Sequence, residues 1–558
     1  MKLHLISDFN LETLQQYLVN ESSWPQLSVT CASFSQVFPA LFQPAADPSD
    51  FALVWTSPDK IVPAFAAALE QTVVDENRML SELHRFADCL LQAKERFRAI
   101  FVVSWSLPPH QRGNGILGLR RQGIRKLLLK MNLTLAEELD SSGNVYLLDG
   151  QRWVETVGKS SYSPKMWYLA KTPFHAEVFR HATAEVKAAI SAVLGAYRKL
   201  VIVDLDNTLW GGVVGELGWE NLRLGGHDYH GQAFVDFQKG LKSLRNRGIL
   251  LAIASRNEER VALEALTNHP EMVLRPSDFA AWRINWNDKA ANIAELVAEL
   301  NLGLQSVVFL DNNPGERARV RGALPEVYVP ELPEDKTLLA STLLQLSCFD
   351  SAYAAAGEGA SRQMYASEKE RGQLRRIVSS TEDWLLSLET EVAVEELNDV
   401  NRARTLQLLN KTNQMNLSTR RLTDQELQVW QQQNCRKLWA IRIKDRFGDS
   451  GVTGILSLEI ESDFARIVDF VLSCRVIGRN VEQAMVAFAA QYCSGLGLRE
   501  VRADYLLTAK NNPCFKFWMS SGFSYDEKKN RFTWLLSQIY GFPRGIKIHL
   551  SRSADGST

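Results

Sequence analysis

The sequence predicts an α/β protein of three domains, and three observations support this prediction. At 558 residues the chain is too long for one hydrophobic core, and domains of about 150 residues give three or four. Short apolar runs, typical of buried parallel strands, alternate with helical spacing before residue 345. The part after about residue 381 has a strand, an Arg- and Gly-containing loop and a helix, a pattern that differs from the earlier parts. The expected parts are 1–195, 196–345, a helical linker over 346–380, and 381–558.

Composition and charge are those of an ordinary soluble protein, with 46% hydrophobic residues, 23% charged residues and a net charge of −1. This balance gives no sign of a nucleic-acid or membrane partner, and no apolar run approaches membrane-spanning length. The seven cysteines lack paired metal-ligand spacing, and Asp8 comes too early for a signal peptide. We therefore expect a protein of the reducing cytoplasm.

The part over 1–195 alternates predicted strands and helices, which favours a small parallel α/β domain. The expected strands are Leu3–Ser7, Phe51–Trp55 and Ala99–Val103, and the expected helices are Asn10–Leu18 and about Ile61–Lys94. Ser7, Asp8 and Asn10 at a strand end, with His175 later, invite comparison with hydrolases that use Ser, Gly, Asn and His. Because the part over 1–195 has no Gly-Asp-Ser nucleophile turn, we favour a docking or scaffold role for it.

The central part is organised around two carboxylates at the end of a predicted buried strand. The strand is Leu200–Val203, and Asp204 and Asp206 follow it directly. Ligands of open α/β sheets bind beyond the carboxyl ends of the strands, where Mg²⁺ bridges a carboxylate to a substrate phosphate. Asp204 is suited to attack phosphorus, and Asp206 to protonate the leaving oxygen. Taken alone, Asp-x-Asp is also compatible with two polar residues that cap a strand.

Three later stretches add side chains that suit phosphate chemistry. A predicted strand over Leu250–Ala254 ends in Ser255, whose hydroxyl can hold a phosphoryl oxygen. Lys289 precedes a helical pattern and can neutralise charge on the phosphoryl group. A third predicted strand, Ser306–Leu310, ends in Asp311, which is suited to complete a Mg²⁺ site. The order and placement of these residues indicate one site.

This constellation resembles the haloacid dehalogenase superfamily of phosphoryl-transfer enzymes. The resemblance implies that Asp204 is the nucleophile and a metal ligand, and that Asp206 is the acid/base with its backbone oxygen on the metal. Asp311 would be the distal metal ligand, and Ser255 and Lys289 would contact the phosphoryl group. The cofactor would be Mg²⁺.

Asn207, Thr208 and Arg256 are further expected substrate contacts. Relatives often carry two adjacent carboxylates at the last motif, whereas Asn312 follows Asp311 here. The stretch between Ser255 and Lys289 has room for only a helix and a short crossover, and the stretch after Thr208 is a Gly-rich loop through Gly218. Neither stretch has room for a large cap domain, so we expect an open site that neighbouring domains or a partner cover.

In the part over 381–558, a predicted strand over Ile467–Leu472 leads through Ser473–Glu482 into an apolar helix, Ala484–Tyr492. A strand, an Arg-x-x-Gly loop and a helix present backbone N–H groups to an anion. The pattern resembles the Gcn5-related N-acetyltransferase fold, in which such a loop grips a pyrophosphate and a pantetheine arm. The substrate-binding residues implied by this resemblance are Arg475, Gly478, Arg479 and Asn511.

Cys474 is the candidate nucleophile of this part. It lies at a strand end, near a helix N-terminus and beside Arg475, and both features lower a thiol pKa and favour the thiolate. A free Cys is otherwise often a small buried hydrophobe. Cys514, which follows Pro513, is a less favoured second candidate.

Both constellations together resemble the FkbH-like proteins of polyketide biosynthesis, a family of glyceryl transferase/phosphatases. The matching stretches are Asp204–Glu216, Ile284–Trp286 with Lys289, Leu409–Asn416, Asp445–Asp449 and Ser473–Arg479. Arg256 stands where relatives more often have Lys. The N-terminal α/β part fits the longer members of the family.

The resemblance implies that 1,3-bisphosphoglycerate is the substrate, and that the product is a D-glyceryl thioester on the phosphopantetheine arm of an acyl carrier protein. Asp204 would remove the phosphate at the third carbon, and Cys474 would displace the acyl phosphate. Two alternatives stay open. One is a bifunctional phosphatase with a CoA-dependent N-acyltransferase domain, and the other is a non-catalytic docking protein for carriers.

Overall fold

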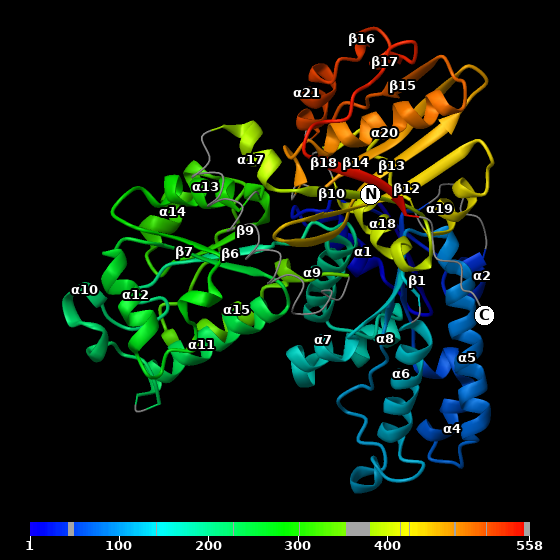
Figure 1. Ribbon diagram of the computed structural model, residues 1–558. Coiled ribbons are helices and arrows are strands. Elements are labelled where there is room, and N and C mark those ends of the chain that lie inside the picture. The colour runs from blue at the N-terminus through cyan, green and yellow to red at the C-terminus, as the bar shows by residue number, and fades with distance from the viewer. Residues whose placement is uncertain are drawn as a thin grey trace, which may run out of the picture. The chain divides into compact units, whose positions relative to one another are not determined.

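The computed structural model describes residues 1–42, 49–140, 142–226, 228–300, 302–352, 380–412, 415–422, 424–473, 476–508 and 511–551. The chain divides into two compact units, Met1–Val193 and Leu194–Thr558 (Figure 1). The second unit contains two separate sheets, one before residue 353 and one after residue 379. Most of the predicted helical linker lies outside the described residues, and the division into three domains stays a prediction. Among the described residues, no helix has the length and apolar character needed to span a membrane.

The first unit is a five-stranded parallel sheet with helices on both faces, as the sequence predicts. The strands, in the spatial order β2-β1-β3-β4-β5, are β1 (Lys2–Ser7), β2 (Ser28–Cys31), β3 (Phe51–Trp55), β4 (Ala99–Val103) and β5 (Val145–Leu148). The helices are α1 (Glu12–Asn20), α2 (Val37–Phe42), α3 (Pro58–Ile61), α4 (Ala66–Leu69), α5 (Glu76–Ala93), α6 (Ile124–Asp140), α7 (Gly150–Val157), α8 (Pro164–Ala170) and α9 (Ala176–Val193).

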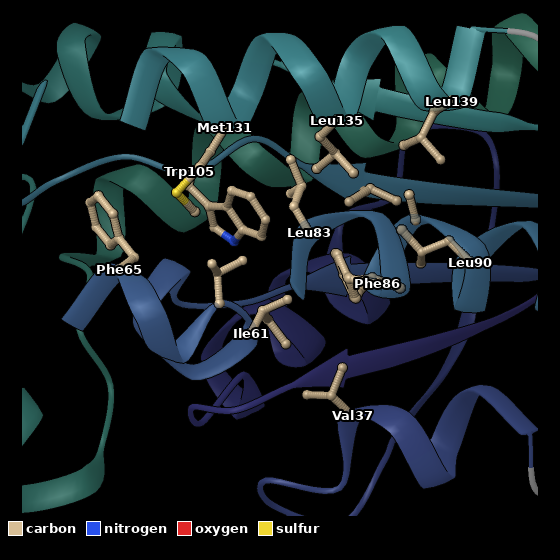
Figure 2. Close-up of a cluster of buried hydrophobic side chains, with 14 of the residues drawn as sticks. Val37, Ile61, Phe65, Leu83, Phe86, Leu90, Trp105, Met131, Leu135 and Leu139 are labelled. Carbon is tan, nitrogen blue, oxygen red and sulfur yellow. The ribbon is translucent and has the colours of Figure 1, made fainter. Parts of the chain in front are cut away.

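The core of this unit forms where α5 and α6 pack against each other over the sheet (Figure 2). Leu83, Phe86 and Leu90 share one face of α5 because they are spaced by three and four residues. The buried Trp105 lies among them, and its indole N–H donates to Thr56 Oγ1 at 3.1 Å. That hydrogen bond satisfies the one polar group that this large side chain takes out of water.

The first sheet of the second unit has four parallel strands in the order β8-β7-β6-β9. The strands are β6 (Leu200–Val203), β7 (Leu250–Ser255), β8 (Ala281–Ile284) and β9 (Val307–Leu310). The helices are α10 (Val214–Leu217), α11 (Tyr229–Asn246), α12 (Glu259–Asn268), α13 (Lys289–Glu299), α14 (Pro314–Ala323) and α15 (Leu339–Leu344). Helices α13 and α14 cover one face, and α11, α12 and α15 cover the other (Figure 1).

The second sheet of this unit is mixed, in the order β16-β17-β15-β14-β13-β12-β10-β18, with β11 paired to β14. Its strands are β10 (Thr390–Glu396), β11 (Met415–Asn416), β12 (Arg436–Asp445), β13 (Gly448–Ile460), β14 (Phe464–Leu472), β15 (Glu500–Asp504), β16 (Ser524–Asp526), β17 (Arg531–Leu535) and β18 (Ile546–Ser551). The helices are α17 (Thr381–Ser387), α18 (Asp399–Lys411), α19 (Asp424–Gln431), α20 (Val481–Gly495) and α21 (Asn512–Ser520). Helices α20 and α21 pack on one face, and α18 and α19 on the other.

Candidate active site

The predicted carboxylates lie together beyond the carboxyl edge of the four-stranded sheet. Val203 at the end of β6 pairs in register with Ile253 of β7 and Leu310 of β9. The backbone N–H of Asp204 donates to the Leu310 carbonyl at 2.9 Å, which brings Asp204 beside Asp311. Parallel strands in register therefore bring the side chains of Asp204, Ser255 and Asp311 to one edge of the sheet, as the sequence predicts.

Lys289 connects two of these carboxylates. Its ammonium group donates to Asp204 Oδ1 at 2.9 Å and to Asp311 Oδ2 at 2.6 Å. All three residues are buried, with at most 6% of each exposed. Lys289 is the first residue of α13, whose start is fixed by Asp288, which accepts a hydrogen bond from the Ala291 N–H. The helix start thus places a positive charge between two buried negative charges.

The electrostatics of the cluster follow from burial and from this shared ammonium. The pKa of Asp204 is raised to about 6, mainly by burial and also by the neighbouring Asp311, although Lys289 and a hydrogen bond from Ser255 act to lower it. Burial lowers the pKa of Lys289, but the attraction of the two carboxylates outweighs burial and leaves this pKa raised. Lys289 is therefore charged, and one ammonium faces two acidic groups in a dry environment.

Asp206 lies in the same loop, and its carboxylate accepts hydrogen bonds from donors other than Lys289. Oδ1 accepts from the Trp210 indole at 2.9 Å and from the Val214 N–H at 3.1 Å, and Oδ2 accepts from Asn257 Nδ2 at 3.0 Å. Asn257 also donates to Ser255 Oγ at 3.2 Å. Three donors thus fix the position of the predicted acid/base.

Within the described residues, no three His, Cys, Asp or Glu side chains converge as a three-ligand metal centre would require. Two carboxylates, those of Asp204 and Asp311, approach a common point at Lys289. The side chain of Asp206 is engaged with Trp210 and Asn257. A metal role for Asp206 would therefore use its backbone oxygen, as the family resemblance implies.

The other polar residues of the motif loop, Asn207 and Thr208, are hydrogen-bonded to the chain itself. Thr208 is fully buried, and its hydroxyl donates to Asn312 Oδ1 and accepts from the Asn312 N–H, both at 3.2 Å. Asn207 has a φ of 54°, and its Oδ1 accepts from the Gly212 N–H at 2.9 Å. Asn312, where relatives often have a second carboxylate, thus ties the first motif to the last one.

Two arginines near the last motif have different surroundings. The Arg256 guanidinium lies 3.1 Å from Glu316 Oε1 and is 45% exposed. Arg317 is buried and donates to the backbone carbonyls of Asp311 and Asn312 at 2.8 and 2.9 Å. Sequence reasoning missed Arg317 and Asn257, because neither residue stands in a motif and only tertiary contacts reveal their partners.

In the C-terminal sheet, Cys474 and Arg475 lie outside the described residues. Gly478 has a φ of 78°, and its N–H donates to Glu482 Oε1 at 2.7 Å. The buried Arg479 guanidinium lies 3.2 Å from Asp445 Oδ2. The backbone and guanidinium groups expected to bind an anion are therefore held by carboxylates of the chain itself.

Glu482 is the unexpected residue of this loop. It lies in the first turn of α20, is 4% exposed, and its Oε2 has no hydrogen-bond partner among the described residues. Burial raises the pKa of this carboxyl group. Its place at the helix N-terminus is one where the helix dipole favours negative charge. The sequence gives no signal of its burial, since an acid in a first helical turn is usually exposed.

Asn511, an expected substrate contact, has all its amide atoms engaged inside the fold. Its Oδ1 accepts from the Tyr505 hydroxyl at 2.7 Å and the Thr508 N–H at 2.9 Å. Its Nδ2 donates to the carbonyls of Asn416 at 3.1 Å and Leu506 at 2.8 Å. Asn511 thus joins β11 to the loop after β15.

Cys514, the second candidate nucleophile, is fully buried. Burial raises the pKa of its thiol to about 12, which disfavours the thiolate that a nucleophile needs. This position therefore gives no support to covalent catalysis.

The strand end in the first unit has a buried acid but no hydrolase arrangement. Asp8 accepts from the Ser57 N–H at 3.0 Å, and burial raises the pKa of Asp8 to about 6. Ser7 Oγ accepts from the Phe9 N–H at 3.1 Å. Among the described residues, no hydrogen bond joins His175 to Ser7 or Asp8.

Comparison with known proteins found similar solved structures. No family model and no curated protein matches the chain. The N-terminal part of the protein BF1531 from Bacteroides fragilis, which contains a phosphatase domain and was solved in complex with Mg, is similar with a TM-score of 0.58 and 28% identity. The similarity covers 63% of this chain and 94% of that chain.

Two further matches each cover about a quarter of this chain. A domain from Methanocaldococcus jannaschii has 13% identity and a TM-score of 0.23, with coverage of 26% of this chain and 99% of that chain. Spermidine/spermine N-acetyltransferase SpeG from Vibrio cholerae, in complex with manganese ions, has 14% identity and a TM-score of 0.20, with coverage of 27% and 95%. These scores are too low to support an argument.

Proposed function

We propose that this protein is a Mg²⁺-dependent phosphoryl-transfer enzyme that loads a D-glyceryl unit from 1,3-bisphosphoglycerate onto an acyl carrier protein. The observation that carries the phosphoryl-transfer part is the buried cluster of Asp204, Lys289 and Asp311 at the carboxyl edge of a parallel sheet. The similarity to a Mg-bound structure with a phosphatase domain supports the same part.

The donor groups suit a hard divalent cation. Carboxylate oxygens of Asp204 and Asp311, with the backbone oxygen of Asp206, are the ligands that Mg²⁺ prefers. Two buried acidic groups share one ammonium, so a further cation would complete the balance of charge. When bound, Mg²⁺ neutralises charge on the phosphoryl group and helps to position it.

The residues of the chain divide the phosphoryl transfer between them. A carboxylate oxygen of Asp204 forms a bond to phosphorus while the bond from phosphorus to the ester oxygen breaks, and Asp206 gives its proton to that oxygen. Water then attacks phosphorus and loses a proton to Asp206. Inorganic phosphate leaves, and Asp204 is regenerated. Lys289 and Ser255 stabilise the phosphoryl oxygens.

The acyl transfer rests on the C-terminal motif. The Cys474 thiolate would form a bond to the acyl carbon of 1,3-bisphosphoglycerate as the bond from that carbon to the phosphate oxygen breaks. The pantetheine thiolate of the carrier would then take the acyl group and release the Cys474 thiolate. The atoms balance without an oxidant or reductant.

One observation favours a carrier protein over coenzyme A as the thiol substrate. A coenzyme A diphosphate at the start of α20 would need the Gly478 N–H, but Glu482 already accepts that hydrogen bond. A carboxylate and a diphosphate at the same place repel each other. The phosphopantetheine of a carrier has no diphosphate and avoids this conflict.

Intact-protein mass spectrometry tests the proposal. A phosphopantetheinylated carrier is incubated with this protein, Mg²⁺ and freshly generated 1,3-bisphosphoglycerate, and a glyceryl-sized mass gain is expected. The Asp204→Asn variant should give a phosphoglyceryl-sized gain at most, and the Cys474→Ala variant should give none. Retained loading in Cys474→Ala would exclude the covalent role of Cys474. Absence of any gain, with phosphate still released, would favour the phosphatase plus CoA-dependent acyltransferase.

A further inference from the structure

A rigid projection of the first unit displays apolar side chains that the fold does not use. We call residues Ser163–Pro173, which include α8, the α8 knob. Its two ends are held together, because the Ser163 N–H donates to the Pro173 carbonyl at 2.8 Å and the His175 N–H donates to the Ser161 carbonyl at 2.8 Å. The knob is therefore a closed excursion of the chain with a fixed base.

The base of the knob is anchored in an aromatic cluster. The Tyr162 and Phe174 rings lie 4.7 Å apart, and Phe174 stacks on Trp55 with the ring centroids 4.7 Å apart. On the other side, the Lys171 carbonyl accepts from the Asn10 N–H at 2.9 Å. These contacts preorganise the knob, so a partner that binds it loses little free energy in ordering it.

The outer surface of the knob is apolar. Met166, Tyr168 and Leu169 are 40%, 78% and 72% exposed, and all three lie on the seven-residue helix α8. Clustered apolar exposure on a rigid element is typical of an interaction surface, because each Å² of apolar surface left in water forgoes about 25 cal/mol. The unit has its own buried core elsewhere, between the sheet and α5 and α6.

The knob also carries only basic charges. From Ser163 to Pro173 the chain has two lysines and no Asp or Glu. Lys165 and Lys171 are exposed, and the Lys171 ammonium lies 5.0 Å from the centre of the Trp167 ring. Exposed apolar side chains and exposed lysines on one short segment are together complementary to an acidic surface that carries apolar side chains.

We propose that the α8 knob is the docking surface for an acidic, apolar helix of the carrier protein. This inference rests on the proposed function for the identity of the partner, while the surface itself rests on exposure and charge. Met166, Tyr168 and Leu169 bury apolar area in the complex, and the lysines steer the acidic partner and fix its orientation.

The test compares carrier binding by calorimetry across matched variants. Met166→Ser/Tyr168→Ser/Leu169→Ser removes the exposed apolar side chains of α8, and Lys165→Glu/Lys171→Glu reverses the charge. We expect each to weaken binding of a phosphopantetheinylated carrier at least about tenfold. Leu129→Ser/Leu133→Ser on α6 is the control, since those residues are 52% and 62% exposed but lie outside the knob. Hydrolysis of a small phosphate ester should be the same in all variants.

The two failures are distinguishable. If the wild type binds and loads the carrier, and the knob variants bind it as tightly as the wild type, the inference is wrong and the proposed function stands. If the wild type binds the carrier through the knob but no glyceryl mass gain follows, the proposed function is wrong and the docking surface stands. Absence of any carrier binding by the wild type would overturn the docking surface.

Discussion

Replacement of Lys289 by Met tests how the buried site is held together. The change removes the ammonium that lies 2.9 Å from Asp204 Oδ1 and 2.6 Å from Asp311 Oδ2, and it keeps most of the apolar stem. Loss of one partner of a buried ion pair costs about 3–5 kcal/mol, because a charge stays buried without compensation. Here two acidic groups lose the same cation, so we expect the upper part of that range.

Urea unfolding measures this cost, with EDTA and with Mg²⁺. Without a divalent cation, Lys289→Met should unfold at a markedly lower urea concentration than the wild type. Mg²⁺ should raise stability by a larger amount in the variant, because no ammonium competes with the cation for the two carboxylates. A native-state ligand at one hundred times its Kd contributes about 2.7 kcal/mol. Phosphate release should fall about 10²–10³-fold, as for the loss of one charge-stabilising donor.

Lys242→Met is the matched control. Lys242 pairs with the buried Asp278 at 2.7 Å, but Asp278 keeps Arg245 at 3.1 Å and the Arg275 N–H at 2.9 Å as partners. Loss of the Lys242 ammonium should lower the free energy of unfolding by about 1 kcal/mol or less, and this change should not depend on Mg²⁺. If Lys289→Met loses no more stability than Lys242→Met and responds equally to Mg²⁺, Lys289 does not hold the cluster.

Three further outcomes are expected. The pKa of Asp8 is about 6 in the folded unit against 3.8 ordinarily, so between these pH values the folded state binds more protons than the unfolded state, and the free energy of unfolding falls as pH rises. In urea unfolding, Asp8→Asn should make this fall smaller by about 1–2 kcal/mol. An unchanged pH dependence would contradict the burial argument. Asn257→Ala should lower kcat about tenfold more for an alkyl phosphate than for p-nitrophenyl phosphate. The reason is that Asp206 loses a hydrogen-bond donor, and only the poor alkoxide leaving group needs the proton of Asp206. Equal losses for the two substrates would mean that Asn257 does not position the acid. Acetyl-CoA should show no saturable binding to the wild type up to about 1 mM in calorimetry, since Glu482 accepts the Gly478 N–H, and micromolar affinity would refute this.

The sequence predicted three strands of the four-stranded sheet, β6, β7 and β9, because each is a short apolar run. It did not predict β8, which contains Arg283 and is only partly buried. Leu200–Val203 is buried at every position, so its signal is free of the alternation seen in half-exposed strands. The polar residue after each run then marks the carboxyl edge. Asp204, Ser255 and Asp311 were placed at one site by this rule and lie there in the structure.

Contacts between distant side chains were beyond the sequence pattern. Lys289 was expected to meet substrate, whereas its bond to two carboxylates depends on where the start of α13 meets the sheet. Asn257 and Arg317 are positioning residues outside the motifs. The two-residue strand β11 is too short to give a periodic signal, and the burial of Glu482 results from tertiary packing.

The central claim is most directly tested by the rate of phosphate release from a small phosphate ester. The assay compares the wild type with Mg²⁺, the wild type with EDTA, and Asp204→Asn with Mg²⁺. We expect release only in the first case, with a loss of at least about 10³-fold in the other two, because both the nucleophile and the cation are required. Undiminished release by Asp204→Asn, or release that is indifferent to EDTA, would contradict a Mg²⁺-dependent aspartyl nucleophile at this site.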